Sequence, residues 1–153
     1  MKTANWEAWQ PLLGEWAGEG AGDPGQGVGR VSFSLELEGN ILVRRNHLDF
    51  PDSPERPAFA HDDLLVTYRE ADGSLRADYF DNEDHVIHYA VTVAADGTIL
   101  HLSQVQPGAP RFRMMYNAAG TGAATIRFEI ALPGRPDDFS AYVVSTAMRR
   151  VGG

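Results

Sequence analysis

The sequence contains no cysteine, which excludes a disulfide framework, a thiolate zinc site and a cysteine nucleophile. Positive charge is also scarce: 13 Lys and Arg residues stand against 21 Asp and Glu residues, and Lys2 is the only lysine. No run of Arg and Lys is longer than two residues. The net charge of −8, without a basic stripe, argues against binding to nucleic acid or to an anionic membrane surface.

Long apolar runs are absent as well. No 18 consecutive apolar residues occur, so no membrane span is expected. The first residues, MKTANWEAWQPLLGEW, include two acidic residues and lack the apolar segment of a secretory signal, so we expect a cytoplasmic protein. A chain of 153 residues fits one domain, and we expect residues 1–153 to form it.

The sequence does contain a series of short alternating runs. Residues 31–37, VSFSLEL, place apolar side chains on one face and polar side chains on the other, which is typical of a half-buried strand. The expected strands cover residues 15–22, 31–37, 41–50, 61–70, 74–82, 85–94, 98–106, 110–118, 124–132 and 138–150. Strands at this spacing, with no second helix, predict an all-β fold: a single up-and-down antiparallel β-barrel of about ten strands.

Turn and helix signals fit the same arrangement. Two Ala-Asp-Gly segments, 71–73 and 95–97, predict hairpin turns, and the proline-rich segment 51–59 predicts a long loop. Residues 4–13 show a helical spacing of Trp and Leu and predict a short N-terminal helix, whose length Pro11 limits.

Glycines favour a barrel over a sandwich. Gly14, Gly18, Gly20 and Gly22 share one face of the first strand with Trp16. Glycines at this spacing allow a strand to bend sharply or to lie close to a crossing strand, as closure of a small barrel requires.

The stretch LLGEWAGEG (12–20), after a short helix, resembles the Gly-x-Trp opening of the calycin superfamily, which includes lipocalins and fatty-acid-binding proteins. The resemblance implies that Trp16 packs against an arginine of the last strand, Arg149 or Arg150, and a cation–π contact is physically reasonable there. The blocks GEWAGEG, LVRRNHLDFP and YFDNEDHVIHY also resemble a bacterial group of calycin-like proteins. That resemblance covers most of the chain but implies no particular activity.

Two better-understood relatives fit less well. Nitrobindin-like haem barrels share the opening block, but they bind iron through a histidine near the C-terminus, and this sequence has no histidine after His101. Fatty-acid-binding proteins hold a carboxylate with an Arg-x-Tyr pair, whereas Tyr142 and Arg149 are too far apart to form it. The resemblance therefore argues against haem, and we expect no cofactor.

The stretch YFDNEDHVIHY (79–89) contains two histidines three residues apart. Side chains alternate on a strand, so His85 and His88 should point to opposite faces and cannot chelate one metal ion. The acidic and amide residues 81–84 are typical of a hairpin turn, and His85 is expected near the barrel rim. We expect no metal site.

The pair Arg44-Arg45 places one arginine inside the barrel, because both faces of its strand carry apolar neighbours. A buried arginine must be paired or bind an anion, and Glu36 or Glu38 could pair with it. Histidines and tyrosines on alternating strands could add polar groups to an apolar lining, although plain core packing explains them equally well. The candidate ligand-binding residues are Arg44, Arg45, His47, Tyr68, His85, Tyr89, His101, Met114 and Tyr116.

These features predict a barrel that binds a small, mostly apolar molecule with one polar or anionic group. The alternatives are a lipocalin-like isomerase, cyclase or hydrolase that uses cavity His, Tyr and Arg residues, a haem or nitric-oxide barrel, and an interaction domain with a filled interior. A cavity lined by two or more titratable groups in mutual reach would favour the enzyme. A homodimer is compatible with all of these readings.

Overall fold

The computed structural model describes residues 6–22, 27–118, 122–145 and 148–151. These residues form eleven strands and one short 3-10 helix, which confirms the all-β prediction. The elements are η1 (Glu7–Leu12), β1 (Gly14–Gly22), β2 (Gly27–Glu36), β3 (Ile41–Phe50), β4 (Phe59–Arg69), β5 (Leu75–Asp81), β6 (Val86–Val93), β7 (Ile99–Ser103), β8 (Arg111–Ala118), β9 (Ala123–Ala131), β10 (Phe139–Ser145) and β11 (Met148–Arg150). Among the described residues, no helix is long and apolar enough to cross a membrane.

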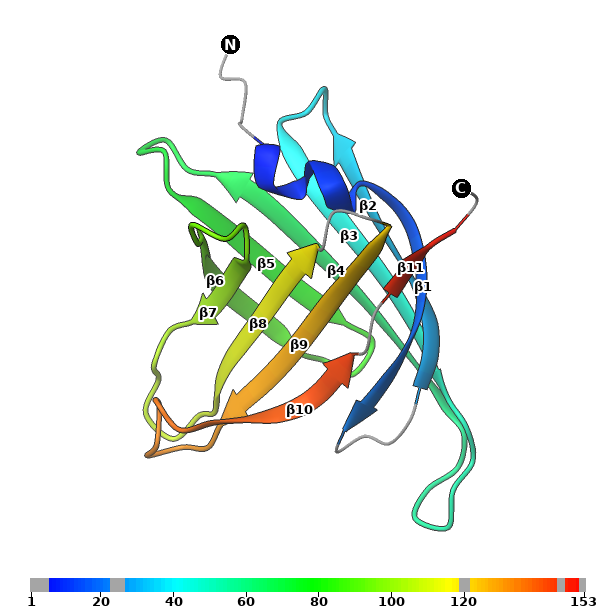
Figure 1. Cartoon of the computed structure of the whole chain (residues 1–153). Helices are drawn as coiled ribbons and strands as arrows, with labels where there is room; N and C mark the ends of the chain where they lie inside the picture. Colours follow the sequence, from blue (N-terminus) through cyan, green and yellow to red (C-terminus); the bar gives the residue numbers. More distant parts are fainter. Residues whose placement is uncertain (1–5, 23–26, 119–121, 146–147, 152–153) are drawn as a thin grey trace.

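The strands form one antiparallel sheet that closes on itself (Figure 1). Strands β2 to β9 pair with their neighbours in sequence, and β1 pairs with β2 on one side and with β10 and β11 on the other. Because β10 and β11 both lie between β1 and β9, they share one position in the ring. The barrel therefore has ten strand positions, in agreement with the sequence prediction.

The predicted turns are confirmed by their local chemistry. In the segment 71–73, the Asp72 carboxylate accepts a hydrogen bond from the backbone N–H of Ser74 at 2.8 Å, and Gly73 has a φ of +91°. The segment 95–97 repeats this arrangement. A positive φ is readily accessible to glycine, so these residues fix the hairpin geometry. The proline-rich residues 51–58 form the long loop between β3 and β4.

One end of the barrel is closed by η1 (Figure 1). Trp9 and Leu12 are buried in this helix, and the indole N–H of Trp6 donates to the carbonyl of Gly39 in the β2–β3 turn at 2.7 Å. Trp16 is buried beside them and the Arg150 guanidinium lies 4.6 Å from its ring centroid. The Trp–Arg contact implied by the calycin resemblance is present, with Arg150 as the arginine, and the closed barrel is consistent with a calycin-like fold.

Close strand contacts explain two of the glycines. A Cβ on Gly18 would lie 3.3 Å from the Met148 side chain, and a Cβ on Gly29 would overlap the carbonyl oxygen of His47. Gly18 and Gly29 are paired on β1 and β2. The close approach expected for the first strand therefore occurs at Gly18 and continues onto its neighbour.

In the stretch 79–89, successive side chains of β6 alternate between the two faces of the sheet, as predicted. Residues 82–84 form the turn between β5 and β6, as predicted. Tyr89 is 1% exposed inside the barrel, whereas the His88 side chain is 74% exposed on the outside, where it pairs with Asp78. His85 lines the cavity of the barrel, on the face opposite to His88. The two histidines therefore do not form a chelate.

Candidate functional site

A cavity of about 310 Å³ opens at the end of the barrel opposite η1, where β3 ends and β4 begins. This volume falls within the range of about 300–1,000 Å³ that small-molecule sites occupy. Its apolar lining residues come from β8 and β9 and from the adjacent ends of β3 and β4: Phe112, Met114, Ile126, Phe128, Phe50 and Phe59. Its polar lining residues come from β3, β4, β5 and the β5–β6 turn: Arg44, Asn46, His61, Asp63, Tyr79, Asp81, Glu83 and His85.

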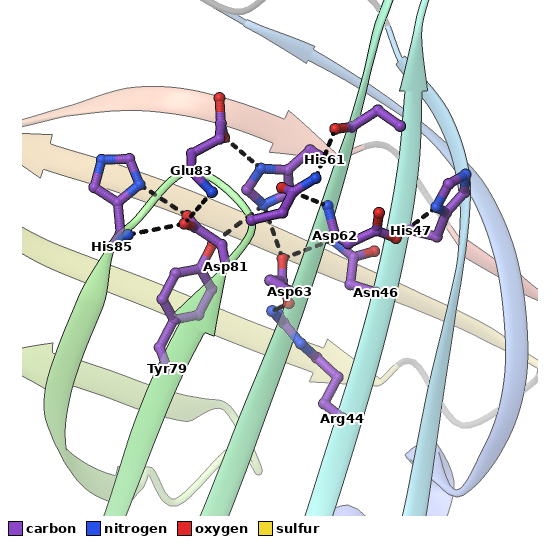
Figure 2. A network of polar contacts seen from close by, with 12 residues as sticks. Arg44, Asn46, His47, His61, Asp62, Asp63, Tyr79, Asp81, Glu83 and His85 are labelled. Carbon is purple, nitrogen blue, oxygen red and sulfur yellow. Dashed lines mark hydrogen bonds and ion pairs between the residues drawn. The ribbon is translucent and has the colours of Figure 1, made fainter.

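The most deeply buried of the polar lining residues, Arg44 and Asp63, form an ion pair (Figure 2). The guanidinium of Arg44 donates to Asp63 and to the hydroxyl of Tyr116, and both side chains of the ion pair are 4% exposed. Asn46 donates a further hydrogen bond to Asp63 at 2.9 Å. Burial opposes ionisation of both partners, but their mutual attraction outweighs it, raising the pKa of Arg44 and lowering the pKa of Asp63.

His61 connects this pair to the mouth of the cavity (Figure 2). Its Nε2 lies 3.1 Å from Asp63 and 3.1 Å from the Tyr79 hydroxyl, while its Nδ1 lies 2.6 Å from Glu83. Burial alone would lower the pKa of His61, but hydrogen bonds to the two carboxylates raise that pKa to about 9. In the absence of other ligands the imidazole is therefore cationic at neutral pH.

Asp81 lies at the junction of β5 and the turn. Its Oδ1 accepts the backbone N–H groups of Glu83 and His85, at 2.9 and 3.0 Å, so it caps the hairpin as predicted. Its Oδ2 accepts from the Tyr79 hydroxyl at 3.1 Å and lies 2.8 Å from Nδ1 of His85. Burial opposes ionisation, but the hydrogen bonds from His85 and Glu83 lower the pKa of Asp81.

The predicted residues fall into three groups. Arg44, Met114 and His85 line the cavity, with His85 at the rim. Tyr116 lies beneath, bonded to Arg44, while Tyr89 and His101 are fully buried in the core and do not line the cavity. On the outer face, three residues point away from the cavity: Arg45, His47 and Tyr68.

The prediction that Glu36 or Glu38 pairs with the inward arginine is wrong. Glu36 pairs with the outward Arg45 at 3.4 Å, because both residues lie on the outer face of paired strands. The inward arginine is Arg44, and its carboxylate partner Asp63 comes from β4 instead.

Sequence reasoning missed His61, Asp63, Tyr79 and Glu83 as members of one site. A signal was present, since His61 and Asp63 share the period-two face of Leu65 and Thr67, which are buried. Of the adjacent pair Asp62-Asp63, Asp62 lies on the outer face, paired with His47, whereas Asp63 lies inside.

The cavity thus combines apolar side chains with a cluster of hydrogen-bonded polar side chains. Such a cavity can hold the apolar body of a ligand together with one polar group. His61 can also exchange a proton with a bound molecule, because its ring lines the cavity. Burial raises the pKa of Tyr79, so its hydroxyl stays protonated and serves as a hydrogen-bond donor. No known family model matches the chain, and no curated protein matches it either.

Proposed function

We propose that the barrel binds a small, mostly apolar molecule that carries one polar group. The observation that supports this proposal best is the mixed apolar and polar lining of the cavity of about 310 Å³. Its aromatic residues include two stacked ring pairs, Phe50 with Phe59 at the ends of β3 and β4, and Phe112 with Phe128 on β8 and β9. Burying an apolar ligand against these rings contributes about 25 cal/mol for each Å² removed from water.

The polar group of the ligand meets His61 and Tyr79 rather than Arg44 alone. Arg44 already pairs with Asp63 and donates to Tyr116, so its charge is offset within the protein. The Tyr79 hydroxyl and the His61 ring line the cavity above this pair. His61 already bonds Asp63 and Glu83, and Tyr79 already donates to Asp81. A ligand hydroxyl, carbonyl or carboxyl group would therefore take over one of these hydrogen bonds, while the buried ion pair stays intact.

Binding of Nile red, an apolar fluorophore with a carbonyl group, tests the proposal. Wild-type protein should bind one molecule per chain with a blue-shifted emission, because the dye enters an apolar cavity. Ile126→Trp should weaken this binding at least tenfold, since the indole fills space among the apolar lining residues.

Thr125→Trp is the matched control, because Thr125 precedes Ile126 on β9 but is exposed on the outer face. It should leave the affinity for Nile red unchanged. Equal affinities in wild type and Ile126→Trp would place the dye outside the cavity and would count against the proposal.

A second candidate function is acid–base catalysis by a lipocalin-like isomerase, cyclase or hydrolase. It is favoured by the titratable groups in mutual reach, with His61 bonded to Asp63, Glu83 and Tyr79. A His61 imidazolium could donate a proton to a ligand in the cavity and recover it from solvent. A natural ligand recovered chemically unchanged after incubation with the protein would favour binding alone.

A further inference from the structure

Three side chains converge at the mouth of the cavity from two separate parts of the chain. His61 comes from β4, Asp81 from the end of β5, and Glu83 from the β5–β6 turn (Figure 2). One ligand atom of each residue lies within 4.8 Å of the ligand atoms of the other two. We propose that His61, Asp81 and Glu83 bind a divalent transition-metal ion of the zinc type.

The donor set suits such an ion. One imidazole and two carboxylates supply three protein ligands, which is the number that zinc sites with an open coordination position use. Nitrogen and oxygen donors together favour zinc over calcium or magnesium, which prefer oxygen alone. The imidazole of His85, 2.8 Å from Asp81, can orient that carboxylate.

A separate observation concerns the far side of the His61 ring. Nδ1 faces Glu83, whereas Nε2 lies 3.1 Å from the buried carboxylate of Asp63. Asp63 is itself held by Arg44 and Asn46. Metal-binding histidines commonly bond a carboxylate through the second ring nitrogen, which fixes the ring orientation. The contact of Nε2 with Asp63 therefore orients the His61 ring in the way that is common for a metal-binding histidine.

Charge and access agree with this assignment. Arg44 offsets Asp63, which leaves the two negative charges of Asp81 and Glu83 beside the His61 imidazole. A divalent cation would displace the proton that His61 shares with Glu83 and would neutralise the two carboxylates. The Glu83 side chain is 45% exposed, so an ion can enter from solvent, and the open coordination position would face the cavity. This inference differs from the sequence-based expectation of no metal site, and it does not depend on the ligand of the apolar cavity.

Calorimetric titration of the chelator-treated protein with zinc chloride tests the proposal. Wild-type protein should bind one zinc ion per chain. Glu83→Gln and His61→Gln should each weaken binding by at least about tenfold, because each removes one ligand. Glu83 lies in an exposed turn, so its variant should fold like the wild type even if His61→Gln does not, and circular dichroism checks both.

His47→Gln is the matched control. His47 also contacts two carboxylates, Asp62 at 2.6 Å and Asp49 at 3.1 Å, but on the outer face of the barrel. This variant should keep the affinity and the stoichiometry of the wild type. Zinc binding that survives Glu83→Gln at full strength, or that disappears in His47→Gln, would overturn the proposal. Nile red binding without zinc binding would refute the metal site and leave the proposed function standing.

Discussion

Asp63→Ala is expected to lower the free energy of unfolding by about 3–5 kcal/mol. The substitution removes the carboxylate that pairs with Arg44, while the guanidinium stays in a site where it is 4% exposed. An unpaired buried charge costs more than the ion pair itself contributes, because the charge has lost water and gains no partner. Urea unfolding at neutral pH measures the effect.

The neighbouring residue provides the control. Asp62 also pairs with another side chain, the imidazole of His47, but both of these side chains are about half exposed. Asp62→Ala should therefore cost less than about 1 kcal/mol, as exposed ion pairs generally do. If Asp62→Ala and Asp63→Ala were equally stable, the folded state would not require Asp63 as the partner of Arg44. Our description of the two residues as a buried ion pair would then be wrong.

Removing both charges should recover much of the loss. In the double variant Arg44→Met/Asp63→Leu, no charge remains at the buried position, and apolar side chains of comparable size replace the pair. Such replacements of buried ion pairs are often neutral or stabilising. The double variant should therefore be more stable than Asp63→Ala alone, although it would lose the groups that orient His61.

Acid should destabilise the barrel through His101. The ring is fully buried, between Tyr89 and Tyr116, at centroid distances of 5.7 and 5.5 Å. Neither ring nitrogen has a well-aligned hydrogen-bond partner among the described residues. Burial, with a smaller contribution from the positive charge of Arg44, lowers the pKa of His101 from 6.5 to about 3. The folded protein therefore holds this ring neutral.

Between pH 6.5 and 3 the unfolded chain binds a proton at His101 that the folded chain does not, so stability falls as the pH falls. From pH 7.5 to 4.5 this contribution should amount to about 2–3 kcal/mol, at about 1.4 kcal/mol for each pKa unit. His101→Leu replaces the imidazole with an apolar side chain of similar size. Between pH 7.5 and 4.5, the free energy of unfolding of this variant should fall by about 2–3 kcal/mol less than that of the wild type. Parallel curves for the two proteins would show that His101 does not titrate in this way.

The fold could be predicted because its signals are local. Period-two alternation, Ala-Asp-Gly turns and the Gly-x-Trp opening each lie within a few residues, and they define strands and hairpins without knowledge of distant contacts. Ring closure was suggested by glycines, and Gly18 does lie against Met148. The predicted short N-terminal helix is present as the six residues of η1, which include Pro11, while residues 4 and 5 of the predicted range lie outside the described residues.

The site could be predicted only in part because it depends on register between strands. The Arg44-Arg45 pair was ambiguous, since both faces of β3 carry apolar residues and only the tertiary structure places Arg44 inside. Its partner Asp63 is 19 residues away in sequence. Similarly, Glu83 was correctly placed in a turn, but its contact with His61 requires the pairing of β4 with β5.

Native mass spectrometry of the protein, purified under mild conditions from the organism that encodes it, tests the proposed ligand-binding function most directly. The wild type and Thr125→Trp should carry a constant extra mass of a small organic molecule, which denaturation releases. Ile126→Trp should show the mass of the bare chain, apart from any bound metal ion. If all three proteins showed only the bare chain, even after incubation with a small-molecule extract of that organism, the cavity would not be a ligand site.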